Sequence, residues 1–258
     1  MKTFQLSEKL LKKIADLIQA KKNSPLKKLV KDIHFADMAE IINELNLDEG
    51  VYLIKLFDSE KTSEILTELD DDVRENILKK LSVKEIADEI EELDSDDAAD
   101  ILGELSDQRK EEVISEISDD SLADDLKELL SYEENSAGGL MAKELVKANE
   151  NWTVTKCLKE IKQQGENVTR VHSIYVVDDK EKLIGRLSLK DLITSPSKKL
   201  IKDIYIPKVD SVNVFEDGEE VAKIMSKYDL EAIPVINNKK QLLGRITIDD
   251  IVDLIKEE

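Results

Sequence analysis

Apolar residues recur every 12 positions between residues 33 and 129 of the chain. The members of this set are Ile33, Leu45, Phe57, Leu69, Leu81, Leu93, Leu105, Ile117 and Leu129. A second apolar set stands three positions earlier in each case, from Val30 to Leu126, so the two sets share one face of a short helix. The pattern predicts an internal repeat with one short helix in each unit.

Residue types that cap helix N-termini follow most members of the first set. They are Asn46, Asp58, Asp70, Ser82, Asp94, Ser106 and Ser118. Their side chains can accept hydrogen bonds from the unpaired N–H groups that begin the next helix. Because an isolated helix of two turns is unstable in water, neighbouring helices must supply the core, as in a solenoid.

The repeat ends near residues 134–139, where acidity stops and two glycines interrupt the helical pattern. Beyond this point the chain alternates between helical and strand-like segments, and it does so twice. The expected elements are helix 154–164, strands 173–177 and 183–188 and a helix from 190, then helix 219–228, strands 233–236 and 242–247 and a helix from 249. The copies align on residues 185–191 and 244–250, which indicates an internal duplication of a β-α-β-β-α unit.

Charge is distributed unevenly along the 258 residues, whose formal net charge is −20. Residues 32–135 hold 35 of the 58 acidic side chains. Such a block repels nucleic acid and attracts cations or basic partners, so nucleic-acid binding is not expected. No apolar run approaches the ~20 residues that cross a bilayer, and the single Cys157 suits a reducing compartment.

The acidic residues gather in several places that suit a hard divalent cation. Asp94, Asp96, Asp97 and Asp100 lie on one turn of the repeat, and Asp249, Asp250 and Asp253 open the last helix. A further group opens the helix expected at 219–228, with Glu216, Asp217, Glu219 and Glu220 at its start and Asp229 after its end. Mg²⁺ prefers carboxylate oxygens and keeps several waters, so it suits shallow acidic surfaces. We expect these groups to repel without a cation and to be bridged by one, so that divalent ions favour a closed state.

A Gly-x-x-Ser/Thr-x-x-Asp pattern ends a strand and begins a helix in both copies of the duplication. This arrangement resembles a tandem pair of CBS domains, a family that binds adenosine nucleotides. The resemblance implies AMP or ATP binding at Ser188, Lys190 and Asp191. The alternative is that the serine or threonine and the aspartate only cap and orient the helix that follows.

The order of the segments resembles the cytoplasmic region of MgtE magnesium transporters. The resemblance is carried by the acidic helical repeat, by residues 34–39 with the sequence HFADMA and by residues 132–141 with the sequence YEENSAGGLM, all ahead of the CBS pair. It implies an α+β multidomain protein. An all-α superhelix with a 12-residue period would span residues 1–134, and two α/β CBS domains would span residues 135–198 and 199–258.

The same resemblance implies a function. The chain would be a Mg²⁺-sensing region on the cytoplasmic side of the cell membrane, closing on Mg²⁺ to gate a membrane pore domain, and forming a homodimer through its CBS domains. The metal-binding residues expected with it are Asp94, Asp97, Gly139, Asp217, Glu219, Ser226, Asp229, Asp250 and Asp253. His34, which begins the first motif, is expected to cap a helix rather than to bind metal.

Other interpretations remain open at the level of sequence. An enzyme is not expected, because neither histidine lies near a nucleophile motif and no glycine-rich phosphate loop is present. An adenine-nucleotide sensor and a passive protein-binding scaffold are the alternatives to a Mg²⁺ sensor. Since the chain ends where family members continue into a connecting helix, we expect a truncated form of a longer protein or, alternatively, a soluble paralogue.

Overall fold

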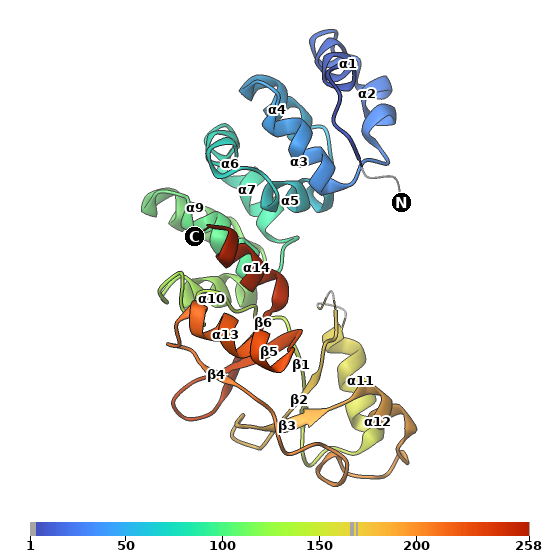
Figure 1. Ribbon diagram of the computed structural model, residues 1–258, viewed down its shortest axis with the longest axis vertical. Helices are drawn as coiled ribbons and strands as arrows, with labels where there is room; N and C mark the ends of the chain where they lie inside the picture. Colours follow the sequence, from blue (N-terminus) through green and yellow to red (C-terminus); the bar gives the residue numbers. More distant parts are fainter. Residues whose placement is uncertain (1–3, 166–167, 169, 258) are drawn as a thin grey trace. The chain divides into compact units, whose positions relative to one another are not determined.

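The computed structural model describes residues 4–165, 168 and 170–257. It divides into two compact units, one of Met1–Leu93 and Asp100–Asp124 and one of Asp94–Ala99 and Asp125–Glu258 (Figure 1). One short segment of the helical repeat, residues 94–99, therefore belongs with the CBS-like duplication. Among the residues that the structure describes, no helix is both long and apolar enough to cross a membrane.

Short helices make up the N-terminal part of the chain. They are α1 (Glu8–Gln19), α2 (Asn23–Val30), α3 (Phe35–Asn43), α4 (Leu47–Ile54), α5 (Ser59–Thr67), α6 (Asp71–Leu78), α7 (Val83–Ile90), α8 (Ser95–Gly103), α9 (Asp107–Glu116) and α10 (Asp120–Leu129). From α3 to α9 each helix begins 12 residues after the one before it. The 12-residue repeat of short helices is thus confirmed.

Side-chain caps explain several of these helix starts. Asn46 and Ser82 each form a capping box with a glutamate three residues later, and the Asp58 carboxylate accepts the N–H of Lys61. His34 also caps its helix, as expected, since its Nδ1 accepts the N–H of Ala36.

Not every expected cap is present. Asp70 and Ser106 make no side-chain cap bond, although both stand at the N-cap position. The prediction for Ser118 is wrong: α10 begins one residue later than the period requires, and the Asp119 carboxylate accepts the N–H groups of Ser121 and Leu122.

Alternate helices of the repeat pack against each other. Contacts join α3 to α5, α5 to α7 and α7 to α9 in one row, and α4 to α6 in another. Each helix buries the predicted apolar face: Ile42, Ile54, Leu66, Leu78 and Ile90 are at most 2% exposed. The short helices are therefore stabilised by their neighbours, as a solenoid requires.

The duplicated part contains two three-stranded sheets. Its elements are β1 (Val146–Asn149), α11 (Val154–Gln164), β2 (Ile174–Val177), β3 (Leu183–Leu187), α12 (Leu189–Thr194), a 3₁₀ turn η2 (Ile201–Asp203), β4 (Val212–Asn213), α13 (Gly218–Tyr228), β5 (Ala232–Ile236), β6 (Leu242–Thr247) and α14 (Ile248–Glu257). The strand orders are β1-β2-β3 and β4-β5-β6, with a parallel pair followed by an antiparallel pair in each sheet. The matching topologies confirm the duplication, and the α+β class is confirmed with it.

A tight turn leads from α10 into the duplicated part. The N–H groups of Ala137 and Gly138 donate to the carbonyls of Glu216 and Val214, so this segment docks directly on the second copy. A Cβ at Gly139 would lie 2.3 Å from the carbonyl oxygen of Glu134, so only glycine fits there.

Candidate cation-binding site

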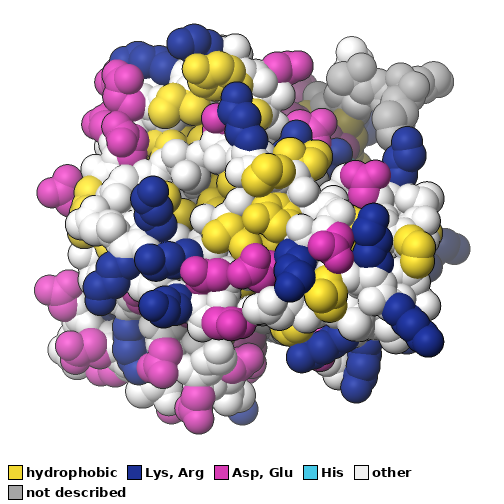
Figure 2. Space-filling view, turned by 90° about the horizontal axis from the view of Figure 1, so that it is seen from below, with side chains coloured by type: hydrophobic (Ala, Val, Ile, Leu, Met, Phe, Trp, Pro, Cys, Tyr) yellow, Lys and Arg dark blue, Asp and Glu magenta, His cyan; other side chains and the backbone are white. Residues whose placement is uncertain are grey.

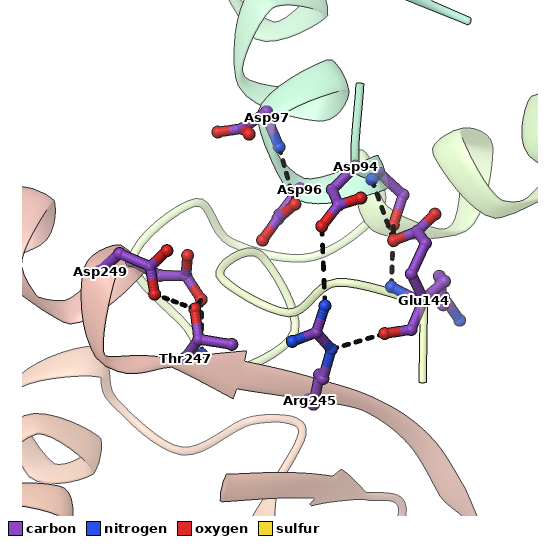
Figure 3. Close-up of polar contacts among 10 residues, drawn as sticks. Asp94, Asp96, Asp97, Glu144, Arg245, Thr247 and Asp249 are labelled. Atoms are coloured by element: carbon purple, nitrogen blue, oxygen red, sulfur yellow. Dashed lines mark hydrogen bonds and ion pairs between the residues drawn. The ribbon is translucent and has the colours of Figure 1, made fainter. Parts of the chain in front are cut away.

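Carboxylates from two distant segments meet within the second unit (Figure 3). Asp94, Asp96 and Asp97 belong to the start of α8, where an acidic first turn suits the positive end of the helix dipole. Asp249 and Asp250 belong to the first turn of α14. The Asp96 carboxylate interacts electrostatically with that of Asp250, about 150 residues further along the chain.

The start of α14 is held by a capping arrangement. The N–H of Thr247 donates to Asp250 Oδ2 over 2.6 Å, and Thr247 Oγ1 lies 3.0 Å from the same oxygen. The Thr247 hydroxyl also contacts the Asp249 carboxylate. These bonds hold both carboxylates of the first turn of α14 beside Thr247, and Figure 3 shows the contact of Asp249 with Thr247.

The positively charged side chain of Arg245, on β6, lies beside this cluster. Its side chain is 6% exposed, and its Nη2 lies 3.6 Å from Asp94 Oδ2. Its Nε donates to the backbone carbonyl of Glu144, while its own N–H and carbonyl pair with the backbone of Ala142. The guanidinium is thus fixed from both sides, between the segment that follows the tight turn and the acidic residues.

A second set of bonds fastens the α8 turn. The N–H and Oγ of Ser95 donate to Glu144 Oε2 over 3.1 and 2.8 Å. Ser95 Oγ in turn accepts the N–H of Lys143 over 2.8 Å, and Lys143 Nζ pairs with Glu128 at 2.8 Å. Ser95 is fully buried, so these bonds are shielded from competing water.

The environment opposes ionisation of Asp96. Dehydration raises the pKa of its carboxyl well above the ordinary value, and the carboxylates of Asp250, Asp97 and Asp94 raise it further. Donation by the N–H of Asp97 acts in the opposite direction. Asp96 therefore holds its proton more tightly than an exposed aspartate.

The environment of Asp250 also opposes ionisation of its carboxyl group. Burial raises its pKa to about 6, and the charge of Asp249 contributes in the same direction. Hydrogen bonds from Thr247 and the positive charge of Arg245 lower the pKa and limit the shift. Burial and the charge of Asp249 thus oppose ionisation of Asp250, whereas Thr247 and Arg245 favour it.

The carboxylates of this cluster are ligands of the kind that Mg²⁺ prefers. All their oxygens are hard ligands, and a divalent cation would offset the repulsion that, after burial, contributes to the raised pKa values of Asp96 and Asp250. Within the described part of the chain, no three His, Cys, Asp or Glu side chains are already arranged to hold a metal ion. Binding of a cation to this cluster would therefore proceed through retained waters or small side-chain movements.

The structure brings three of the predicted metal-binding residues, Asp94, Asp97 and Asp250, to this cluster. Asp253 is exposed and lies one helical turn after Asp249 on α14. The other predicted residues lie on different elements, and their role in binding metal stays a prediction.

Gly139 lies in the tight turn, and Asp217 and Glu219 begin α13. The Asp217 carboxylate accepts the N–H of Glu219 over 3.0 Å, and Glu219 pairs with Lys223 at 3.5 Å. Ser226 and Asp229 are exposed at the far end of α13, where Asp229 ends the helix in the left-handed region with φ 54°.

The predicted nucleotide residues occupy the start of α12. The Ser188 hydroxyl donates to Asp191 Oδ2 over 2.7 Å, and Ser188 Oγ accepts the N–H of Asp191 over 3.0 Å. Lys190 is exposed beside them. Ser188 therefore caps α12 with Asp191 bonded to it, and nucleotide binding at these residues stays a prediction.

Comparison with known proteins supports the same organisation. The MgtE intracellular N domain family matches residues 33–135, and the CBS domain family matches residues 137–198 and 201–257. The magnesium transporter MgtE of Thermus thermophilus is 39% identical over 130 residues, which are 50% of this chain and 29% of that protein. The chain thus spans less than a third of this relative in the matched segment.

Two solved structures match almost the whole chain. The soluble part of a magnesium transporter has a TM-score of 0.81 at 28% identity, and the match covers 97% of this chain and 98% of that one. The cytosolic domain of the Mg²⁺ channel MgtE in complex with ATP has a TM-score of 0.86 at 30% identity, covering 95% of this chain and 99% of that one. The chain belongs to the MgtE family. The order of an N domain and a CBS pair, inferred above from the repeat and the duplication, is confirmed.

Sequence reasoning missed two residues of this cluster. Arg245 and Glu144 were not among the candidates, although Arg245 follows the glycine that aligns the two copies of the duplication. Its equivalent, Arg186, is exposed. Spacing alone does not distinguish the two arginines, because only the folded chain brings acidic side chains to one of them.

The raised pKa of Asp250 predicts a pH dependence of stability. Between the unfolded pKa near 4 and the folded pKa of about 6, the folded state holds the proton that the unfolded state releases. The free energy of unfolding should therefore fall as pH rises from 5 to 7 in EDTA, with a contribution from Asp250 of at most about 3 kcal/mol.

Urea unfolding measured by the fluorescence of Trp152, the single tryptophan, reports on this unit because Trp152 packs on its core. The fall between pH 5 and pH 7 should be smaller in Asp250→Asn than in the wild type. Asp70→Asn is the control, since Asp70 is exposed and makes no side-chain cap bond. Equal slopes in Asp250→Asn and the wild type would contradict the prediction.

Proposed function

We propose that the chain is the cytosolic Mg²⁺-sensing regulatory region of an MgtE-type magnesium transporter or channel and that it carries no catalytic activity. Divalent cations bind to the cluster of Asp94, Asp97 and Asp250, with Asp96 and Asp249 beside it. The observation that carries the proposal is the meeting of these carboxylates in a partly dehydrated space, where the pKa values of Asp96 and Asp250 are raised.

The physical link between binding and regulation is the shared use of two segments. Residues 94–99 come from the helical repeat, whereas Asp249 and Asp250 come from the last helix of the CBS pair. A cation that binds both segments stabilises the state in which they meet, and its loss favours their separation. In the longer protein, this change would reach a membrane pore domain and close the pore when Mg²⁺ is abundant.

Titration calorimetry with MgCl₂, at constant ionic strength set by KCl, tests this proposal. Asp94→Asn and Asp250→Asn should weaken Mg²⁺ binding about tenfold or more, since each removes a charged ligand. Asp70→Asn is the matched control, because Asp70 occupies the position of Asp94 two repeats earlier and should leave binding unchanged.

Two results would count against a Mg²⁺ sensor. Equal binding by the wild type, Asp94→Asn and Asp250→Asn would place the cation elsewhere. No heat beyond that of added KCl would mean that salt screening alone acts on the acidic residues, as expected of a passive scaffold.

We propose in addition that the chain forms a homodimer through its CBS domains. The last helix in each half of the duplicated part presents large apolar side chains to solvent. Leu189 and Ile193 on α12 are 47% and 63% exposed, and Val252 and Ile255 on α14 are 44% and 59% exposed. Apolar side chains also interrupt the mixed charges on the face shown in Figure 2. Exposed apolar faces of this kind are typical of interfaces, and two-fold dimers are the commonest assemblies.

Sedimentation equilibrium of the double variant Ile193→Glu, Val252→Glu tests this assembly. The charges should shift the wild-type dimer toward monomer, because they cannot be buried unpaired. Leu47→Glu, at an exposed apolar residue of the helical repeat, should sediment like the wild type. A monomeric wild type at micromolar concentration, or a variant that remains a dimer, would contradict this interface.

Adenine-nucleotide binding is a second candidate function. It is favoured by the Ser188 and Asp191 arrangement and by the matching cytosolic domain of MgtE, which is described in complex with ATP. An aspartate at the start of a helix can accept two hydrogen bonds from a ribose diol, and the helix N-terminus favours phosphate. ATP would then act as a second ligand of the regulatory region, together with the exposed Lys190.

Thermal melting with ATP in EDTA tests the nucleotide site. ATP should raise the melting temperature of the wild type, and Asp191→Ala should lose this increase because the ribose contact is removed. Asp250→Ala is the matched control, since Asp250 is the equivalent residue of the second copy. Loss of the increase in Asp250→Ala but not in Asp191→Ala would move the site to the other copy.

A further inference from the structure

A fixed positive charge lies inside the acidic cluster. The Arg245 guanidinium is almost fully buried, 3.6 Å from the Asp94 carboxylate, and its charge also lowers the pKa of Asp250. Burying a guanidinium costs free energy unless charges and hydrogen bonds compensate it. Here the compensation comes from the carbonyl of Glu144 and from the carboxylates of the cluster.

The internal duplication supplies a natural comparison. Arg186 is the equivalent residue of the first copy, and the backbones of both arginines form an isolated antiparallel bridge: Arg186 with Ile206, and Arg245 with Ala142. The backbone roles are therefore alike. The side chains differ, because Arg186 is exposed whereas Arg245 is buried beside Asp94. The burial of Arg245 thus depends on the segments that pack on it, not on its place in the strand.

Arg245 is also bonded to the residues that hold the α8 turn. Glu144 accepts the Arg245 Nε–H with its carbonyl and the Ser95 donors with its carboxylate. Residues 94–99 are consequently fastened to the CBS pair by the bonds of Ser95 to Glu144 and by the ion pair of Asp94 with Arg245. The bond from Arg245 Nε to the Glu144 carbonyl links these two sets of contacts.

We propose that Arg245 is a built-in counter-cation, which takes the place of a divalent ion beside Asp94 and Asp250 in the metal-free protein and holds residues 94–99 on the CBS pair. When Mg²⁺ binds, it takes over part of this neutralisation. This second step rests on the proposed function. Arg245 is a positioning residue in this role, because it acts on the metal ligands and not on the metal.

Amide hydrogen exchange measured by NMR tests the proposal in the full chain. Two amides report on the contact, since the N–H of Ser95 donates to Glu144 and the N–H of Lys143 donates to Ser95. In EDTA, Arg245→Gln should lower the protection of both amides about tenfold or more, the equivalent of about 1.4 kcal/mol. MgCl₂ should restore most of it, because the cation replaces the lost charge.

Two further variants separate charge from structure. Arg245→Lys keeps a cation near Asp94 but loses the planar fork, and it should retain most of the protection in EDTA. Arg186→Gln, the matched control, should behave like the wild type with and without MgCl₂. In each variant, protection of the amides of β5 and β6 shows that the second sheet is folded. If Arg245→Gln does not fold, the test is made with Arg245→Lys.

Three results would overturn the proposal. The first is unchanged protection of the Ser95 and Lys143 amides in Arg245→Gln in EDTA. The second is a loss of this protection that MgCl₂ does not restore while the amides of β5 and β6 stay protected, and the third is a loss in Arg245→Lys as large as in Arg245→Gln. Failure of the proposed function is seen separately, as an absence of Mg²⁺ binding in calorimetry of the wild type. The comparison of the two Arg245 variants in EDTA does not depend on that result.

Discussion

Repulsion between carboxylates in a partly dehydrated space is the interaction on which the second unit depends. Asp96 and Asp250 come from segments far apart in the sequence. Burial is the main cause of their raised pKa values, and the charge of Asp250 raises the pKa of Asp96 further. Arg245 offsets part of this repulsion with one fixed charge. In the proposed function, a further positive charge at this contact favours the state in which residues 94–99 and the CBS pair meet.

The rest of the repeat shows why this position differs from its equivalents. Asp70 and Asp94 occupy the same place in the 12-residue unit, ahead of α6 and α8. Asp70 is exposed, whereas Asp94 is half-buried and faces Arg245. The repeat thus provides acidic helix starts at regular intervals for local reasons of capping and helix dipole. One of these starts becomes part of a site because another segment packs on it.

The CBS duplication illustrates the same point. Ser188 with Asp191 and Thr247 with Asp250 form similar hydrogen bonds at the starts of α12 and α14. The local chemistry is nearly equal, yet only Asp250 lies beside further carboxylates and a buried arginine. In the proposed function, the two copies of this capping motif serve different ligands, a nucleotide in one copy and a divalent cation in the other.

The sequence by itself determined the helical repeat, the caps at Asn46, Asp58 and Ser82, the duplicated β-α-β-β-α unit and the three acidic residues of the cluster that were predicted. These features depend on periodicity and on bonds between residues three or four positions apart, so the local sequence is enough to predict them. It did not determine the start of α10, where Asp119 and not Ser118 caps the helix. Only the tertiary structure decided that Arg245 is buried and Arg186 exposed, and that Asp96 meets Asp250. Burial and pKa depend on which distant segments pack together, and no local pattern carries that information.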